Sequence, residues 1–361
     1  MSSLLDPTEL SGMALANRVV MAPITRGRAT RDGVPTPEMA VYYGQRTSAG
    51  LIITEGTHPS RIGQGYPGTP GLHTGRHVIA WRSVTRAVHE MGGRIFVQLM
   101  HTGRIGHPLT TGVSPVAPSA VKPAGTVTTC AGRKPYVMPQ AMSQAMVRET
   151  ICAFTAAAGR AIAAGFDGVE LHGGNGYLIH QFLACNTNRR TDGYGGSVSG
   201  RIRFVTELVE AVAAEIGRHR VGLRLSPGKG TNDVEENRAH LVYPALVSAL
   251  PDIAYLHLIA ASPDDPLVQD IRRRWRGTLI ANPAHGGAQL PDDGGRADAE
   301  AWLARGADLV SFGRAFIANP DLVRRFQRAA PLARAEPSTV IGSGPYGYID
   351  YPALDEAAAT V

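Results

Sequence analysis

Short apolar runs alternate along the chain with longer stretches in which apolar positions recur every three or four residues. Each short run is apolar on both faces, as expected for a buried parallel strand, and each longer stretch has the period of a helix. The short runs are at residues 18–21, 50–54, 94–99, 168–171, 221–225, 255–258, 278–281 and 309–312. The clearest helical stretches are at 78–91, 147–164, 201–216 and 297–305.

Eight strands that alternate with helices predict one α/β domain over residues 1–361, folded as a (β/α)8 TIM barrel. A doubly wound parallel sheet is the alternative that the same alternation allows. Residues 103–139 are rich in Pro, Ser, Thr and Gly and interrupt the unit after the third strand. We expect this segment to be an insertion that caps the barrel mouth, because it is too long and irregular for an ordinary loop.

Composition narrows the class of protein. The chain has 361 residues, of which 43% are hydrophobic and 18% charged, so it can bury a sizeable core. Its three cysteines form no C-x-x-C pair and no Cys/His ligand spacing, so we expect neither a metal site nor an iron–sulfur cluster. The sequence also shows no signal peptide and no apolar run long enough for a membrane span, which favours a cytoplasmic enzyme.

Two features of the sequence point elsewhere but carry little weight. The formal net charge of +6 raises the question of nucleic acid, yet the basic residues are scattered and their densest run, 272–276, precedes a predicted strand. The segments 63–68 and 342–347 both fit G-x-G-x-x-G, but each contains proline and neither joins a clear strand to a helix. We therefore expect no nucleic-acid partner and no separate dinucleotide-binding domain.

Residues at the carboxyl ends of the predicted strands are the candidates for chemistry, because active sites of such barrels lie there. Gly56 would let a flat ring approach the backbone, and Gln98 offers a donor and an acceptor to the edge of such a ring. Arg224 is a permanent cation that can stabilise negative charge on a reduced ring. Gly313 and Arg314 follow the eighth strand, where barrels commonly bind phosphate.

The loop after the fourth strand reads His-Gly-Gly-Asn-Gly-Tyr from His172 to Tyr177. His172 and Asn175 can both donate hydrogen bonds to a carbonyl or nitro oxygen, and they could hold developing enolate charge. Tyr177 carries a phenolic proton that can be delivered to carbon. A glycine-rich helix start with a buried histidine is the alternative that the loop alone leaves open.

With these motifs the chain resembles the Old Yellow Enzyme family of FMN-dependent ene-reductases over residues 4–354. The matching segments are 15–26, 97–104, 172–183, 190–197, 312–314 with 319–322, and 347–352. The resemblance implies bound FMN, and NADPH or NADH as the hydride donor. Hydride would pass through flavin N5 to the β-carbon of an activated alkene such as an enone, enal or nitroalkene.

The resemblance also implies roles for individual residues. His172 and Asn175 would bind the substrate oxygen, and Tyr177 would protonate the α-carbon. Contacts to the flavin ring would come from the strand ends, and Gly313 and Arg314 would contact its phosphate. The expected ring contacts are Pro23, Ile24, Thr25, Gly56, Gln98 and Arg224. The expected substrate pocket adds Tyr66, Met100 and Tyr348 to His172 and Asn175.

Three positions depart from the family pattern. Met100 stands where the family usually has tryptophan, which predicts a wider pocket and an altered stereochemical preference. The turn at 282–287 contains Pro283, which lacks an N–H, where the family tends to have a glycine-rich turn. Residues 199–201 read Ser-Gly-Arg in place of Glu-Asn-Arg, which we expect to affect local packing only.

Two other functions stay open at this stage. One is a flavin-binding sensor or storage protein without turnover, which the intact His172, Asn175 and Tyr177 argue against. The other is a flavin-free barrel enzyme such as an aldolase, for which Lys229 would be the only nearby catalytic lysine. The sequence leaves open the physiological alkene, the choice between NADPH and NADH, and whether the protein is a monomer or a homodimer.

Overall fold

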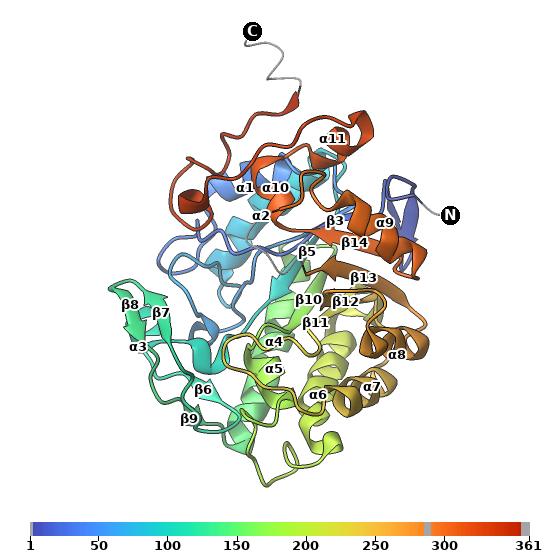
Figure 1. Cartoon of the computed structure of the whole chain (residues 1–361). Helices are drawn as coiled ribbons and strands as arrows, with labels where there is room; N and C mark the ends of the chain where they lie inside the picture. Colours follow the sequence, from blue (N-terminus) through green and yellow to red (C-terminus); the bar gives the residue numbers. More distant parts are fainter. Residues whose placement is uncertain (1–2, 285–289, 355–361) are drawn as a thin grey trace.

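The architecture is a closed barrel of eight parallel strands, seen in a computed structural model that describes residues 3–284 and 290–354. Around the barrel the strands follow the order β10-β11-β12-β13-β14-β3-β4-β5 (Figure 1). They are β3 (Val19–Met21), β4 (Leu51–Ile53), β5 (Ile95–Leu99), β10 (Gly168–Gly173), β11 (Val221–Leu225), β12 (Tyr255–Ala260), β13 (Thr278–Pro283) and β14 (Leu309–Phe312). Each strand lies at a predicted apolar run, so the (β/α)8 barrel is confirmed and the doubly wound sheet is excluded.

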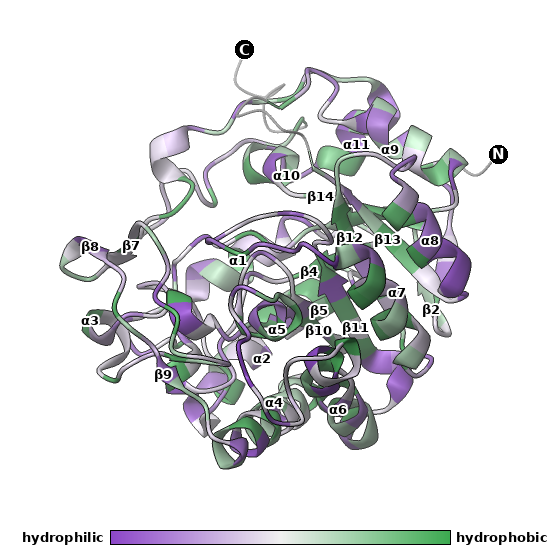
Figure 2. Ribbon diagram, turned by 60° about the horizontal axis from the view of Figure 1, so that its bottom comes forward, coloured by the Kyte–Doolittle hydropathy of each residue, from purple (hydrophilic) through white to green (hydrophobic). Residues whose placement is uncertain are grey.

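Helices form the outer layer of the barrel. Figure 2 shows hydrophobic residues concentrated on the barrel strands, whereas α8 is largely hydrophilic. The helices are α1 (Pro37–Gly44), α2 (Gly75–Glu90), α3 (Pro108–Thr111), α4 (Gln144–Ala163), α5 (Leu178–Leu183), α6 (Val198–Ile216), α7 (Ala239–Ala249), α8 (Pro266–Arg274), α9 (Arg296–Ala304), α10 (Arg314–Ala318) and α11 (Leu322–Arg328). None of them, within the described residues, has the length and apolar character needed to cross a membrane.

Three predicted helices begin three residues earlier than their apolar period indicates. The side chain of Ser143 accepts a hydrogen bond from the backbone N–H of Met146, and Ser197 does the same for Gly200. Thr74 caps α2 through the backbone N–H of His77. A capping side chain starts the helix at its polar first turn, before the first buried position appears in the sequence.

The end of the barrel opposite the predicted site is closed by a hairpin that the apolar pattern did not predict. Strands β1 (Thr8–Leu10) and β2 (Met13–Leu15) pair antiparallel. Leu10 and Leu15 pack in one buried cluster with Phe96 and Tyr255 from inside the barrel. Because both aromatic rings fill this end, the strands beside them need very small residues, and Gly168 and Gly222 lie there.

Gly222 offers a test of this packing. A Cβ built on Gly222 would overlap the ring of Tyr255, which is completely buried. We therefore expect Gly222→Ala to lower the free energy of unfolding by about 1–3 kcal/mol, the usual cost of overpacking a core. Urea unfolding followed by circular dichroism would measure it.

Gly75→Ala is the matched control, because Gly75 begins α2 and a Cβ there meets no atom within 4 Å. We expect it to change stability by less than about 0.5 kcal/mol. An equal loss in the two variants would contradict the packing explanation.

The segment between β5 and α4 is built from short elements. It contains η2 (Gly103–Ile105), α3, β6 (Val116–Ala117), the hairpin of β7 (Thr126–Thr129) with β8 (Gly132–Pro135), and β9 (Gln140–Ala141), which pairs with β6. Ile105, Val127 and Tyr136 form a small apolar cluster of their own, and Tyr66 and Tyr177 pack against it. The segment therefore contacts two residues of the predicted site, Tyr66 and Tyr177.

Candidate active site

The carboxyl ends of the strands surround a cavity of about 480 Å³. Residues from β11, β12, β13, β14 and the loop after β3 line it. Five of the predicted cofactor contacts are in its wall: Pro23, Ile24, Arg224, Gly313 and Arg314. The barrel thus brings together residues that are up to 291 positions apart in the chain, from Pro23 to Arg314.

Arg224 places a buried cation in this wall. Its Nη2 donates a hydrogen bond to Oδ1 of Asn282 at 2.5 Å, whereas its Nε has no partner among the described residues. Burial lowers the pKa of the guanidinium, but an arginine stays charged in a protein. A buried cation with an unused N–H suits a ligand that carries or develops negative charge.

The other end of the cavity is also basic. Gly313 follows β14 and precedes α10, which begins at Arg314. A Cβ on Gly313 would lie 3.2 Å from Ile24, so glycine keeps the wall clear at this point. Lys229 lines the same cavity, and burial beside Arg224 and Arg314 lowers the pKa of its ammonium group.

The turn after β13 is only partly described. Pro283 ends β13 and lines the cavity, and the N–H of Ala284 donates to the carbonyl of Ala260 at 2.8 Å. That N–H is therefore already used within the barrel. Residues 285–287 of the turn that departs from the family pattern lie outside the described residues.

Three predicted ring contacts, Thr25, Gly56 and Gln98, are not among the described residues of the cavity wall. Gln98 lies within β5, where its Nε2 donates to Oε1 of Glu170 at 2.8 Å. Gly56 follows β4, and a Cβ there would lie 2.6 Å from Sδ of Met100. The missing side chain at 56 thus makes room for Met100, which is itself buried.

His172 and Asn175 lie side by side. Nε2 of His172 is 3.5 Å from Nδ2 of Asn175. His172 lies within β10 and not after it, since the strand continues to Gly173, two residues beyond its predicted end at Leu171. Burial, and then the charge of Arg224, lower the pKa of His172 well below its ordinary value, so the ring is neutral near pH 7. Its Nδ1 is buried and has no partner among the described residues.

The backbone conformation at Asn175 and Gly176 explains why these residue types occur in the loop. Asn175 has φ +54°, in the left-handed region that asparagine tolerates better than most residues. Gly176 has φ +75°, and a Cβ there would overlap the carbonyl of Thr231. Glycine at 176 therefore lets the loop after β11 pack directly on the loop after β10.

Tyr177 is the capping residue of α5, and its hydroxyl lies 3.0 Å from the hydroxyl of Tyr66. The ring centroids of His172 and Tyr177 are 5.3 Å apart. Burial raises the pKa of Tyr177, so its phenol stays protonated at neutral pH. The structure thus brings two hydrogen-bonding side chains and a protonated phenol close together.

The structure places Tyr348 away from the cavity, contrary to its predicted place in the substrate pocket. Its ring is completely buried and stacks on Tyr42 with centroids 4.2 Å apart. The guanidinium groups of Arg26 and Arg28 lie 5.1 and 4.7 Å from its centroid. Tyr348 therefore anchors the C-terminal segment to the loop after β3. The motif at 347–352 thus contributes to packing through Tyr348.

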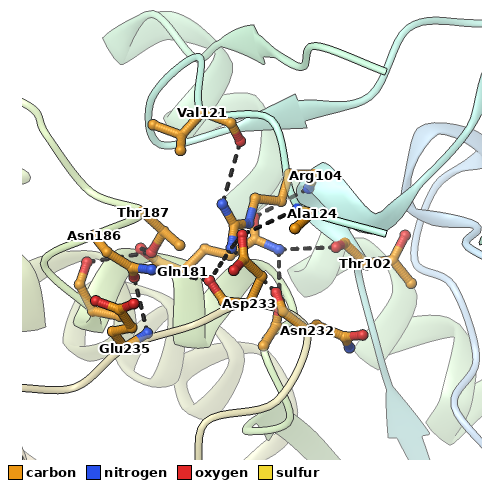
Figure 3. A network of polar contacts seen from close by, with 12 residues as sticks. Thr102, Arg104, Val121, Ala124, Gln181, Asn186, Thr187, Asn232, Asp233 and Glu235 are labelled. Carbon is orange, nitrogen blue, oxygen red and sulfur yellow. Dashed lines mark hydrogen bonds and ion pairs between the residues drawn. The ribbon is translucent and has the colours of Figure 1, made fainter. Parts of the chain in front are cut away.

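Prediction residue by residue missed a polar network that joins Arg104, Gln181 and the loop at Asn232 (Figure 3). Arg104 donates to the carbonyls of Asn232 and Asp233 at 3.1 and 2.6 Å. Nδ2 of Asn232 donates to the carbonyl of Asn175 at 2.8 Å.

Gln181 joins the same network, since its Oε1 accepts from the N–H of Arg104 and its Nε2 donates to the carbonyl of Gly176. The only sequence signal for Arg104 and Gln181 was their place inside matched family motifs.

These observations define a class of protein. A (β/α)8 barrel with a cationic cavity at its strand ends, beside a hydrogen-bonding pair and a protonated phenol, is typical of barrel enzymes that bind an anionic cofactor.

Comparison with known proteins places the chain within that class. Residues 3–333 match the model of the NADH:flavin oxidoreductase / NADH oxidase family. A probable flavin mononucleotide-dependent alkene reductase of Leishmania infantum is 41% identical, covering 97% of each chain. The solved Old Yellow Enzyme homologue of Zymomonas mobilis is 41% identical with a TM-score of 0.92, covering 98% of this chain and 100% of its own. A morphinone reductase structure with tetrahydroNAD has 41% identity and a TM-score of 0.91, covering 99% of both chains.

The chain belongs to the Old Yellow Enzyme family of FMN-dependent oxidoreductases. It is an NAD(P)H-dependent flavin oxidoreductase with FMN as its cofactor. The resemblance stated from the motifs is therefore confirmed, and a flavin-free barrel enzyme built on Lys229 is excluded.

Proposed function

We propose that the protein reduces activated carbon–carbon double bonds of small enones, enals and nitroalkenes. The observation that carries this proposal is the close placement of His172, Asn175 and Tyr177 at the mouth of the barrel. A pair of hydrogen-bonding side chains can polarise the oxygen that activates the alkene, and a phenol can supply the proton that completes reduction. The alkene reductase and morphinone reductase among the relatives support the same class of substrate.

The residues of the site have separate roles in the proposed reaction. His172 and Asn175 hold the substrate oxygen and the negative charge that grows on it, and Tyr177 gives its proton to the α-carbon. FMN, when bound, would supply the hydride chemistry at the β-carbon, with NADPH or NADH as the source of the hydride. The neutral state of His172 suits this role, because a neutral imidazole with one N–H can donate without adding a further charge beside Arg224.

The residues present fit FMN. The unused Nε of Arg224 and the basic wall around Arg314 suit the anionic parts of the cofactor. We propose that Gly313 and Arg314 contact the phosphate. We further propose that the ring is held by the loops after β3 and β4 and by side chains on β5 and β11, through Pro23, Ile24, Thr25, Gly56, Gln98 and Arg224.

We propose that residues 1–361 form one FMN-binding domain, in which the segment 103–139 caps the barrel mouth. The support is the apolar cluster of that segment, against which Tyr66 and Tyr177 pack. Tyr66 and Met100 would then bound the substrate pocket with His172 and Asn175. Because Met100 occupies the space beside Gly56 with a flexible side chain, the pocket can adapt to bulkier alkenes.

A spectrum and two titrations test the proposed function. The purified protein should show the absorbance of bound flavin, which NADPH or NADH should bleach in the absence of oxygen. Addition of 2-cyclohexenone should then restore the oxidised spectrum with formation of cyclohexanone. Flavin that is reduced by the nucleotide but not reoxidised by any enone, enal or nitroalkene would leave a flavoprotein without alkene turnover and contradict the proposal.

A further inference from the structure

One layer of side chains inside the barrel is polar, although such barrels are usually filled by branched apolar residues. Glu170, His257 and Ser311 point into the barrel from the alternate strands β10, β12 and β14, and all three are at most 1% exposed. Burying a carboxylate and an imidazole costs free energy unless both are hydrogen-bonded and compensated. Three strands that each contribute a polar group to one chain of contacts indicate a role beyond packing.

The contacts in this layer form one chain that ends at a predicted flavin contact. Oε2 of Glu170 lies 2.7 Å from Nδ1 of His257, whose Nε2 lies 2.8 Å from the hydroxyl of Ser311. The other oxygen of Glu170 accepts from Nε2 of Gln98 at 2.8 Å. The carboxylate thus receives hydrogen bonds from two sides and links β5 to β12 across β10.

Charge decides the direction of each hydrogen bond. Burial alone would raise the pKa of Glu170, but the hydrogen bond from His257, the charge of Arg224 and the hydrogen bond from Gln98 lower it, so Glu170 is a carboxylate. Burial lowers the pKa of His257 despite that carboxylate, so the ring is neutral near pH 7. Ser311 then donates to Nε2 of His257, and Nδ1–H of His257 donates to Glu170.

An ionised carboxylate only accepts hydrogen bonds, so the amide nitrogen of Gln98 must face it. The amide oxygen and one N–H of Gln98 remain to meet a ring. Glu170 and Arg224 lie two positions apart in the register of the paired strands β10 and β11, and the charge of Glu170 raises the pKa of Arg224 against the effect of burial. One buried carboxylate therefore acts on two side chains of the proposed flavin site.

We propose that Glu170, held by His257 and Ser311, is a positioning residue that orients Gln98 and offsets the charge of Arg224, and so sets the affinity and the reduction potential of the bound flavin. This inference rests on the proposed roles of Gln98 and Arg224 in holding FMN.

Glu170→Gln tests it, because the variant keeps the shape of the side chain but removes the charge and lets the Gln98 amide turn. The full-length protein would be stripped of flavin and titrated with FMN by fluorescence, and the potential of the bound flavin would be measured against a reference dye. We expect FMN to bind at least tenfold more weakly. Removing a negative charge also favours the more negative reduced flavin, so we expect at least a tenfold shift of the redox equilibrium toward the reduced form, about 30 mV more positive for a two-electron couple.

Glu207→Gln is the matched control, since Glu207 on α6 accepts one hydrogen bond from the hydroxyl of Tyr194 outside the barrel. It should change neither the affinity nor the potential. If Glu170→Gln does not fold, His257→Leu serves instead: it removes one of the hydrogen bonds that hold the same carboxylate but keeps its charge, so it should weaken FMN binding by less than Glu170→Gln would.

An unchanged potential and FMN affinity in folded Glu170→Gln would overturn the inference, and a loss of thermal stability with both values unchanged would reduce Glu170 to a structural role. Failure of the proposed function has a different signature. In that case the wild-type protein would bind FMN and accept electrons from NADPH or NADH, but its reduced flavin would not react with any enone, enal or nitroalkene.

Discussion

Removing both hydrogen-bonding side chains of the oxygen site is expected to lower kcat/KM for 2-cyclohexenone by about 10²–10³. That is the usual loss when preorganised donors to a developing oxyanion are deleted. The variant should be His172→Ala with Asn175→Gly, because position 175 has φ +54° and alanine would add backbone strain there. Stopped-flow reoxidation of the reduced flavin by the enone is the measurement, since it isolates the step in which the oxygen is held.

His240→Ala is the control for this variant, because His240 is exposed on α7 and is not part of the described cavity wall. It should leave reoxidation unchanged. The pH dependence gives a second check: a histidine whose pKa lies well below its ordinary value does not titrate between pH 6 and 8. A reoxidation rate that falls with an apparent pKa near 6.5 and loses this step in His172→Ala would contradict the neutral donor.

Tyr177→Phe is expected to slow reoxidation by an enone by about 10²–10⁴, the range that a positioned proton donor contributes. Reduction of the flavin by NADPH should keep its rate, because no proton from Tyr177 is needed there. Since burial raises the pKa of Tyr177, the phenol stays protonated and the wild-type rate should not fall as the pH rises from 7 to 9. Single-turnover kinetics of the two half-reactions would measure both effects.

Tyr66→Phe separates the proton donor from its neighbour, because it removes the hydroxyl that lies 3.0 Å from that of Tyr177 but keeps Tyr177. We expect a loss of no more than about tenfold from this variant, the size of one hydrogen bond. Equal losses in the two half-reactions of Tyr177→Phe would show a general disturbance of the site and count against proton delivery.

Much of the barrel could be predicted from local pattern. A parallel strand buried on both faces is recognisable as a short apolar run, and all eight runs became strands. The hairpin at Thr8–Leu15 was missed because each of its strands has only three residues, too few to show a period. The apolar side chains of this hairpin become buried only when the barrel has formed and its end lies against them.

The family motifs predicted the place of one loop correctly but misplaced Tyr348. His172 and Tyr177 are only five positions apart in one loop, so their proximity could be predicted from the sequence alone. Tyr348 shares a family motif of equal clarity but is buried against Tyr42 and two guanidinium groups. A motif records that a residue matters, and it does not record which side of the backbone that residue faces.

The sequence itself determined the order of strands and helices and the flavin-enzyme family. It also determined the loop that contains His172, Asn175 and Tyr177. Each of these depends on residues that are close in the chain. The tertiary structure alone decided which distant residues share a cavity or a charge. Arg224 meets Asn282, and Glu170 meets both Gln98 and His257, only after the barrel closes. Contacts of that kind are properties of strand register and burial, and local spacing carries no information about either.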